Sequence, residues 1–230
     1  MVGLTKNHNL LLFDFTKTIK DDKKPIKKHK LFFIGFLICM LGIFFSTILQ
    51  NIIDKFIDPN FTNFDRLDYP INLHFFFKIV LLGPILEELG FRLFLKPRKR
   101  VYIPISFAIC SFYILGFLFR DLNIYYKLSL SIFSFGLTYF YSNNIKQIIE
   151  DYYSCSFYLT AFIFSFLHLK TFNSISQIQW VFFLIVILPY FFYAIAFSYV
   201  RIKSNTFLAI LLHAAINGIA FFIKYIVVLW

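Results

Sequence analysis

Long apolar runs separated by short polar stretches dominate the chain. Seven of these runs have the roughly 17 to 25 residues that a transmembrane helix needs. They cover residues 31–49, 72–95, 101–119, 124–142, 155–172, 177–200 and 206–228. The pattern predicts an all-α fold, a polytopic transmembrane helical bundle of about seven spans. The count stays open between six and eight, because residues 101–142 could form two tight spans or one span and an interfacial helix.

A polar, basic segment precedes the first apolar run. Residues 1–30 contain eight lysines, and we expect no cleavable signal peptide there because the following apolar run is too long. With residues 143–154 and 201–205 taken as loops, fifteen Lys and Arg residues fall on one side of the membrane and five on the other. The positive-inside rule then places the N-terminus in the cytoplasm and the C-terminus outside. We expect a basic cytoplasmic tail, 1–30, and a single transmembrane helical domain, 31–230.

Composition supports an integral, multi-pass membrane protein. Of the 230 residues, 59% are hydrophobic and 35 are phenylalanine, far above the apolar share of a soluble domain. The net charge of +11 comes mainly from the predicted span ends, so it indicates contact with the lipid bilayer and no nucleic acid. The three cysteines lie in apolar segments and form no zinc-type pair or disulfide framework.

Ionisable residues inside the predicted spans are few, and two adjacent glutamates stand out among them. Glu88 and Arg92 are four residues apart, so they share a helix face and can form an ion pair. Glu87 points about 100° away. It lies nine residues before Lys96, about 13 Å into the membrane. Pro84 loosens the helix just upstream. One reading is that these charges only mark the helix end; the other is a functional site with Glu87 as its free carboxylate.

Two further residue pairs, each with a polar member, lie in later spans. Phe164 and His168 form one pair, and His213 and Asn217 the other, each with four-residue spacing. Either pair alone is as typical of interhelical packing and hydrogen bonding as of catalysis. His213 lies about 15 Å from the cytoplasmic side and Asn217 about 21 Å, so both can meet Glu87 at one level.

Taken in order, the three patterns resemble the motifs of the CPBP family, the type II CAAX prenyl endopeptidases and bacteriocin-processing or immunity proteins also called Abi. The resemblance covers about residues 72–228. Two departures are visible: Leu93 stands where the family often has glycine, and the first two motifs are 81 residues apart, about twice the family's usual separation. An insertion of two helices, residues 101–142, explains this separation and preserves the direction in which the second-motif helix crosses the membrane.

The resemblance implies an intramembrane endopeptidase. Glu87 and His168 would activate water, and His213 and Asn217 would form the oxyanion site. Glu88, Arg92 and Phe164 would support them. We expect no cofactor, although a zinc-dependent version with Glu87, His168 and His213 as ligands is an alternative.

Other readings of the polar cluster stay open. The chain could be a non-catalytic membrane scaffold or a bacteriocin-immunity protein, or the cluster could line a transport path. For the protease, we expect a peptide or membrane-protein substrate, prenylated or of the bacteriocin type. We expect the bacterial plasma membrane as its location.

Overall fold

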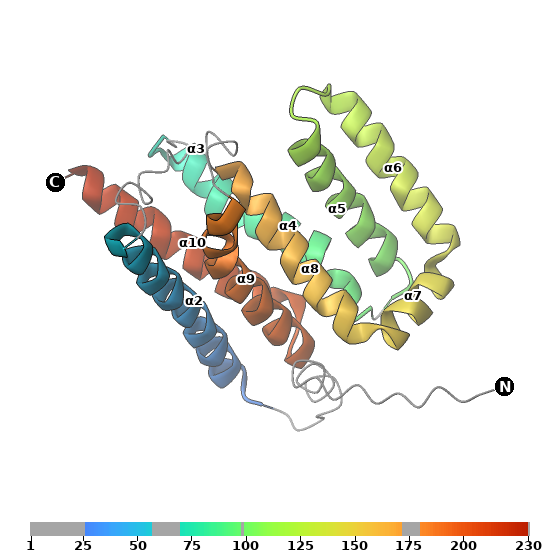
Figure 1. Cartoon of the computed structure of the whole chain (residues 1–230). Coiled ribbons are helices and arrows are strands. Elements are labelled where there is room, and N and C mark those ends of the chain that lie inside the picture. The colour runs from blue at the N-terminus through green and yellow to red at the C-terminus, as the bar shows by residue number, and fades with distance from the viewer. Residues whose placement is uncertain (1–25, 57–69, 98, 172–179, 230) are drawn as a thin grey trace.

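The computed structural model describes residues 26–56, 70–97, 99–171 and 180–229, so the predicted tail lies mostly outside the described residues. Regular structure in these ranges is helical throughout, which confirms the all-α prediction (Figure 1). The first half holds α2 (Lys28–Phe56), α3 (Leu73–Phe76), the π-helix η1 (Phe77–Leu82), α4 (Gly83–Phe91), the 3-10 helix η2 (Leu93–Leu95) and α5 (Tyr102–Leu118). The second half holds α6 (Ile124–Phe140), α7 (Ser142–Asp151), α8 (Tyr153–Leu167), the 3-10 helix η3 (His168–Thr171), α9 (Trp180–Lys203) and α10 (Thr206–Leu229).

Three of the described helices are long and apolar enough to cross a membrane. They are α2, the Phe183–Lys203 part of α9 and the Thr206–Ile226 part of α10. The apolar helix α5 is shorter, with 17 residues. The chain is thus a helical integral membrane protein, and the count of seven spans stays a prediction.

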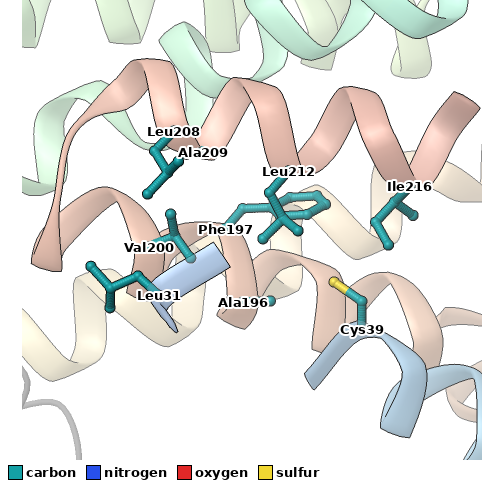
Figure 2. Close-up of a cluster of buried hydrophobic side chains, with 9 residues drawn as sticks. All are labelled: Leu31, Cys39, Ala196, Phe197, Val200, Leu208, Ala209, Leu212 and Ile216. Carbon is teal, nitrogen blue, oxygen red and sulfur yellow. The ribbon is translucent and has the colours of Figure 1, made fainter. Parts of the chain in front are cut away.

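Helices α2, α9 and α10 pack together around one apolar cluster (Figure 2). Glycines in α2 permit the close approach: a Cβ atom at Gly35 would lie 2.5 Å from the Leu212 side chain, and one at Gly42 would lie 2.5 Å from Phe192. Small interface residues of this kind let helix backbones come close in membranes. The cluster also includes Phe197, and it thereby fixes one wall of the polar site described below.

The predicted span 72–95 is helical in extent, but its hydrogen-bond pattern changes along its length. A short α-helical turn passes into the π-helix η1 and then into α4, which begins with Gly83 and Pro84. α4 ends at Phe91, and Arg92 is its C-cap. The segment is therefore a composite of helix types, with the change falling where the sequence predicts a proline-loosened helix.

Residues 143–154, which the sequence predicts as a loop, largely form the helix α7. The prediction was wrong because this helix has only ten residues and is amphipathic. Ile145 and Ile149 pack toward Leu95, whereas Lys146 and Glu150 form an exposed ion pair of 3.8 Å. A short helix with one apolar face is too polar overall to register as an apolar run.

Residues 101–142, predicted to be an insertion, form the hairpin α5–α6, in which α5 packs against α4 and α8, and α6 packs mainly against α5 (Figure 1). The α4 contact is close: a Cβ atom at Gly90 would lie 2.9 Å from the Ile109 side chain. The hydroxyl of Ser106 donates to the carbonyl of Gly90 at 2.5 Å and to that of Leu89 at 3.0 Å. Helix α5 therefore packs directly against the helix that carries the two glutamates.

Candidate active site

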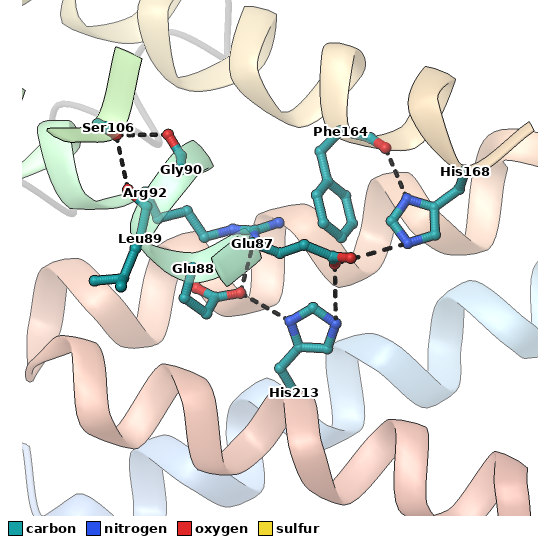
Figure 3. Close-up of polar contacts among 9 residues, drawn as sticks. All are labelled: Glu87, Glu88, Leu89, Gly90, Arg92, Ser106, Phe164, His168 and His213. Atoms are coloured by element: carbon teal, nitrogen blue, oxygen red, sulfur yellow. Dashed lines mark hydrogen bonds and ion pairs between the residues drawn. The ribbon is translucent and has the colours of Figure 1, made fainter. Parts of the chain in front are cut away.

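Three helices bring the predicted polar residues together (Figure 3). α4 carries the two glutamates and has Arg92 as its C-cap, His168 forms the C-cap of α8, and α10 supplies His213 and Asn217. The segments are far apart in sequence, and the common level predicted for Glu87 and His213 is confirmed by their contact.

Glu88 is the buried centre of a three-residue network. Its Oε1 atom accepts a hydrogen bond from Nη1 of Arg92 at 2.7 Å and one from Nδ1 of His213 at 3.0 Å. The side chains of Glu88 and Arg92 are 0% and 1% exposed. The predicted ion pair is confirmed, and its function is more specific than expected, since the carboxylate also holds the histidine of another helix.

Aromatic rings surround the rest of the Arg92 guanidinium. Its Cζ atom lies 4.2 Å from the ring centroid of Phe164 and 5.3 Å from that of Phe197. Among the described residues, Nε and Nη2 of Arg92 have no hydrogen-bond acceptor. Cation–π contacts of this kind stabilise a desolvated guanidinium, so the buried charge depends on one carboxylate and two ring faces.

Glu87 lies on the opposite side of this network and faces both histidines. Its Oε2 atom is 3.6 Å from Nε2 of His213 and 3.9 Å from Nε2 of His168. The Glu87 side chain is 18% exposed, and in the part of the chain that the structure describes it forms no ion pair with Lys or Arg. Of the two adjacent glutamates, Glu87 is the one that is accessible, and it has no Lys or Arg partner among the described residues.

The hydrogen bonds of the two histidines assign their ring nitrogens. Nδ1 of His168 lies 2.8 Å from the carbonyl oxygen of Phe164, and Nδ1 of His213 contacts the Glu88 carboxylate. Both partners accept hydrogen bonds, so Nδ1 carries the proton in each ring. In the neutral form, both Nε2 atoms then present a lone pair toward Glu87. The arrangement suits a water molecule that is held and deprotonated between them.

Asn217 lies one turn beyond His213 but is turned toward a different group. Its Nδ2 atom donates to the carbonyl oxygen of Ile79, in η1, at 3.0 Å. The structure thus brings Glu87, His168 and His213 into one cluster and places the Asn217 amide against the helix that leads to Glu87.

α9 contributes two site residues that the sequence motifs do not include. Tyr190 stacks on His168 with ring centroids 4.5 Å apart, and Phe197 stacks on His213 at 4.3 Å. Phe164 lies between the two imidazoles, 4.3 Å from His168 and 6.0 Å from His213. Aromatic residues make up 22% of the chain, so no pattern in the sequence could have singled these out.

The hydrogen bonds of the two histidines are compatible with the zinc alternative, but the positions of the candidate ligands are not. Histidines that ligate a metal commonly donate their other ring nitrogen to a carboxylate or backbone carbonyl, as His168 and His213 do. Within the described ranges, however, no three His, Cys, Asp or Glu side chains form a group that could hold a metal ion.

The fold and the site define a class: a polytopic helical membrane protein with a glutamate–histidine cluster at the meeting point of three helices. Residues 69–219 match the family model described as "Type II CAAX prenyl endopeptidase Rce1-like", and the match covers about two thirds of the chain. The chain therefore belongs to the Rce1-like family of type II CAAX prenyl endopeptidases and is an intramembrane protease of the CAAX type. No curated protein and no solved structure matches it.

Proposed function

We propose that the protein hydrolyses a peptide bond of a prenylated or otherwise membrane-associated peptide, with Glu87 as the general base. The observation that carries the proposal is the pair of Nε2 atoms facing one Glu87 oxygen at 3.6 and 3.9 Å. Glu87 has no Lys or Arg partner in the described structure, whereas Oε1 of Glu88 already accepts two hydrogen bonds.

The reaction begins with a water molecule between Glu87 and His168. The Glu87 carboxylate takes a proton from the water. The oxygen of that water then bonds to the carbonyl carbon of the substrate, and the carbonyl oxygen of the substrate gains the negative charge. Collapse of this intermediate breaks the C–N bond, and the protonated Glu87 gives its proton to the leaving amine. His168, fixed by the Phe164 carbonyl, orients the water through its Nε2 lone pair.

His213 and Asn217 are the proposed donors to the oxyanion. His213 would donate from Nε2 when both ring nitrogens carry protons, and the Glu87 and Glu88 carboxylates lie 3.6 and 3.0 Å from its ring nitrogens. Asn217 uses one amide hydrogen for Ile79, and its second amide hydrogen is the one proposed to reach the substrate. One such hydrogen-bond donor stabilises the transition state by about 3 to 4 kcal/mol.

The test is cleavage of a farnesylated CAAX peptide by the purified protein in detergent or liposomes. Glu87→Gln, which keeps the shape but not the base, is expected to lower kcat at least a hundredfold. Glu150→Gln removes an exposed carboxylate from α7 and is the matched control. Full cleavage by Glu87→Gln would overturn the assignment. If neither the parent protein nor the control cleaves this or other membrane peptides, the non-catalytic scaffold reading is favoured.

The zinc-dependent version of the protease is supported by one feature, the direction of the two Nε2 lone pairs. Glu87, His168 and His213 would be its ligands, and the metal would activate the water in place of the carboxylate. Elemental analysis of the purified protein separates the two versions. We expect less than stoichiometric zinc and cleavage that resists chelators; one zinc per chain, with activity lost on chelation, would replace the glutamate mechanism.

A further inference from the structure

The π-helix before α4 leaves one backbone carbonyl without its helical donor. At the end of η1, the N–H of Gly83 donates to the carbonyl of Lys78, five residues earlier. In this pattern the next carbonyl, that of Ile79, would accept from residue 84. Residue 84 is proline, which has no N–H. An unpaired carbonyl inside a membrane protein is costly, so another donor is needed.

Asn217 supplies that donor from α10. Its amide nitrogen lies 3.0 Å from the Ile79 oxygen. The next residue is Gly218, where a Cβ atom would lie 3.7 Å from the Val80 side chain, so the α10 backbone closely approaches η1 at this level. The side-chain amide thus replaces the hydrogen bond that Pro84 cannot make.

We propose that Asn217 is a positioning residue that holds the junction of η1 and α4 through the Ile79 carbonyl, and that it thereby sets the direction of Glu87. Glu87 lies three residues after Pro84, just beyond the first turn of α4. A slip of one residue at the junction would rotate its carboxylate by about 100° around the helix, away from both imidazoles. The catalytic part of the proposal rests on the proposed function; the hydrogen bond and its structural role do not.

A second contact shows why the hydrogen bond between Asn217 and the Ile79 carbonyl, called the Asn217–Ile79 tie below, affects the site. One turn before Asn217 on the same α10 face, His213 contacts both carboxylates of α4, with Glu88 at 3.0 Å and Glu87 at 3.6 Å. α10 therefore touches the composite helix on both sides of Pro84. Two contacts one turn apart fix rotation as well as distance, which a single contact cannot do.

A double-mutant cycle between Asn217 and Pro84 tests the proposal. Asn217→Leu removes the donor at similar volume, and Pro84→Ala restores a backbone N–H where Ile79 needs one. Thermal unfolding in detergent and cleavage kinetics are measured for the parent protein, both single variants and the double variant. We expect Asn217→Leu to lower Tm and to lower kcat at least tenfold with KM nearly unchanged. In the Pro84→Ala background we expect the loss in Tm to shrink to less than half. The loss in kcat should shrink only to the part that the proposed oxyanion contact of Asn217 accounts for.

The control cycle pairs Pro84→Ala with Asn123→Ala, which removes the N-cap of α6. Its two effects are expected to add, because Asn123 and Pro84 lie on different elements with no shared partner. If the effects of Asn217→Leu and Pro84→Ala also add in both Tm and kcat, Asn217 does not act through Ile79 and the proposal is wrong. If Asn217→Leu does not fold, recovery of a folded, monodisperse protein in the double variant supports the proposal, and continued failure contradicts it.

The two measurements, peptide cleavage and the coupling in Tm, separate a failure of this proposal from a failure of the proposed function. Should no variant cleave any peptide, the protease assignment fails while the coupling in Tm still tests the tie. Should cleavage depend on Glu87 while the coupling is zero, the protease assignment stands and only the tie is lost.

Discussion

Nδ1 of His213 donates a hydrogen bond to Oε1 of Glu88 at 3.0 Å and joins α10 to α4 inside the bundle. The same oxygen accepts the Arg92 guanidinium, so one carboxylate oxygen neutralises a buried cation and fixes a histidine of another helix. Because Nδ1 is occupied, it is Nε2 of His213 that faces Glu87. The second glutamate of the motif, for which the resemblance implies a supporting role, therefore contacts His213 directly.

Replacement of Glu88 by glutamine is expected to destabilise the fold strongly. The change leaves Arg92, 1% exposed, without a negative partner. Breaking a buried ion pair by removing one partner costs about 3 to 5 kcal/mol. The unfolding free energy of the purified protein in mixed micelles, measured by denaturant titration, checks this value.

An exposed pair with the same spacing provides the control. Lys146 and Glu150 are also four residues apart, but both are more than half exposed. Glu150→Gln is expected to cost less than about 1 kcal/mol. Equal losses for Glu88→Gln and Glu150→Gln would show that burial of the Glu88–Arg92 pair does not matter for stability.

Tyr190 is expected to assist the reaction through its ring and not through its hydroxyl. The ring stacks on His168 at an interplanar angle of 28°, with ring centroids 4.5 Å apart. Aromatic contacts of this kind are worth about 0.5 to 1.5 kcal/mol. Tyr190→Phe should therefore keep the kcat of the parent protein, and Tyr190→Ala should lower it about two- to tenfold.

Steady-state cleavage of the CAAX peptide by both Tyr190 variants gives the answer, with unfolding curves measured alongside. An equal loss in Tyr190→Phe and Tyr190→Ala would assign the effect to the hydroxyl and contradict the stacking role.

Local spacing in the sequence predicts the parts of the site that lie on one helix. The Glu88–Arg92 pair follows from four-residue periodicity, and the common level of Glu87 and His213 follows from helix rise. Contacts between helices have no such signal. Phe197 is one of 35 phenylalanines, and its stacking on His213 depends on how α9 packs against α10. The tie between Asn217 and Ile79 depends on a π-helix, which apolar periodicity does not reveal.

Two glycines that look alike in sequence are expected to respond in opposite ways to alanine. A Cβ atom at Gly42 would lie 2.5 Å from Cβ of Phe192, at the contact of α2 with α9, whereas Gly136 of α6 has nothing within 4 Å. Gly42→Ala should cost about 1 to 3 kcal/mol through overpacking. Gly136→Ala should stabilise the protein by about 0.5 to 1 kcal/mol, because alanine favours the helix. Unfolding curves of the two variants, recorded together, check the signs; the same sign for both would contradict the packing of α2 on α9.

The orientation predicted from the basic residues can be tested at two exposed positions. α7 is predicted to lie on the cytoplasmic side and the connection between α5 and α6 on the outer side, because α6 alone separates them. In a variant without Cys39, Cys110 and Cys155, we introduce Glu150→Cys or Asp121→Cys, each at an exposed residue. A membrane-impermeant maleimide added to intact cells or spheroplasts should label only the Asp121→Cys protein, and lysis should expose the Glu150→Cys site.

The reverse labelling pattern would contradict the predicted orientation and place α7 on the outer side of the membrane. Labelling of both positions in intact cells would mean that α6 does not cross the membrane, which would reduce the count of seven spans.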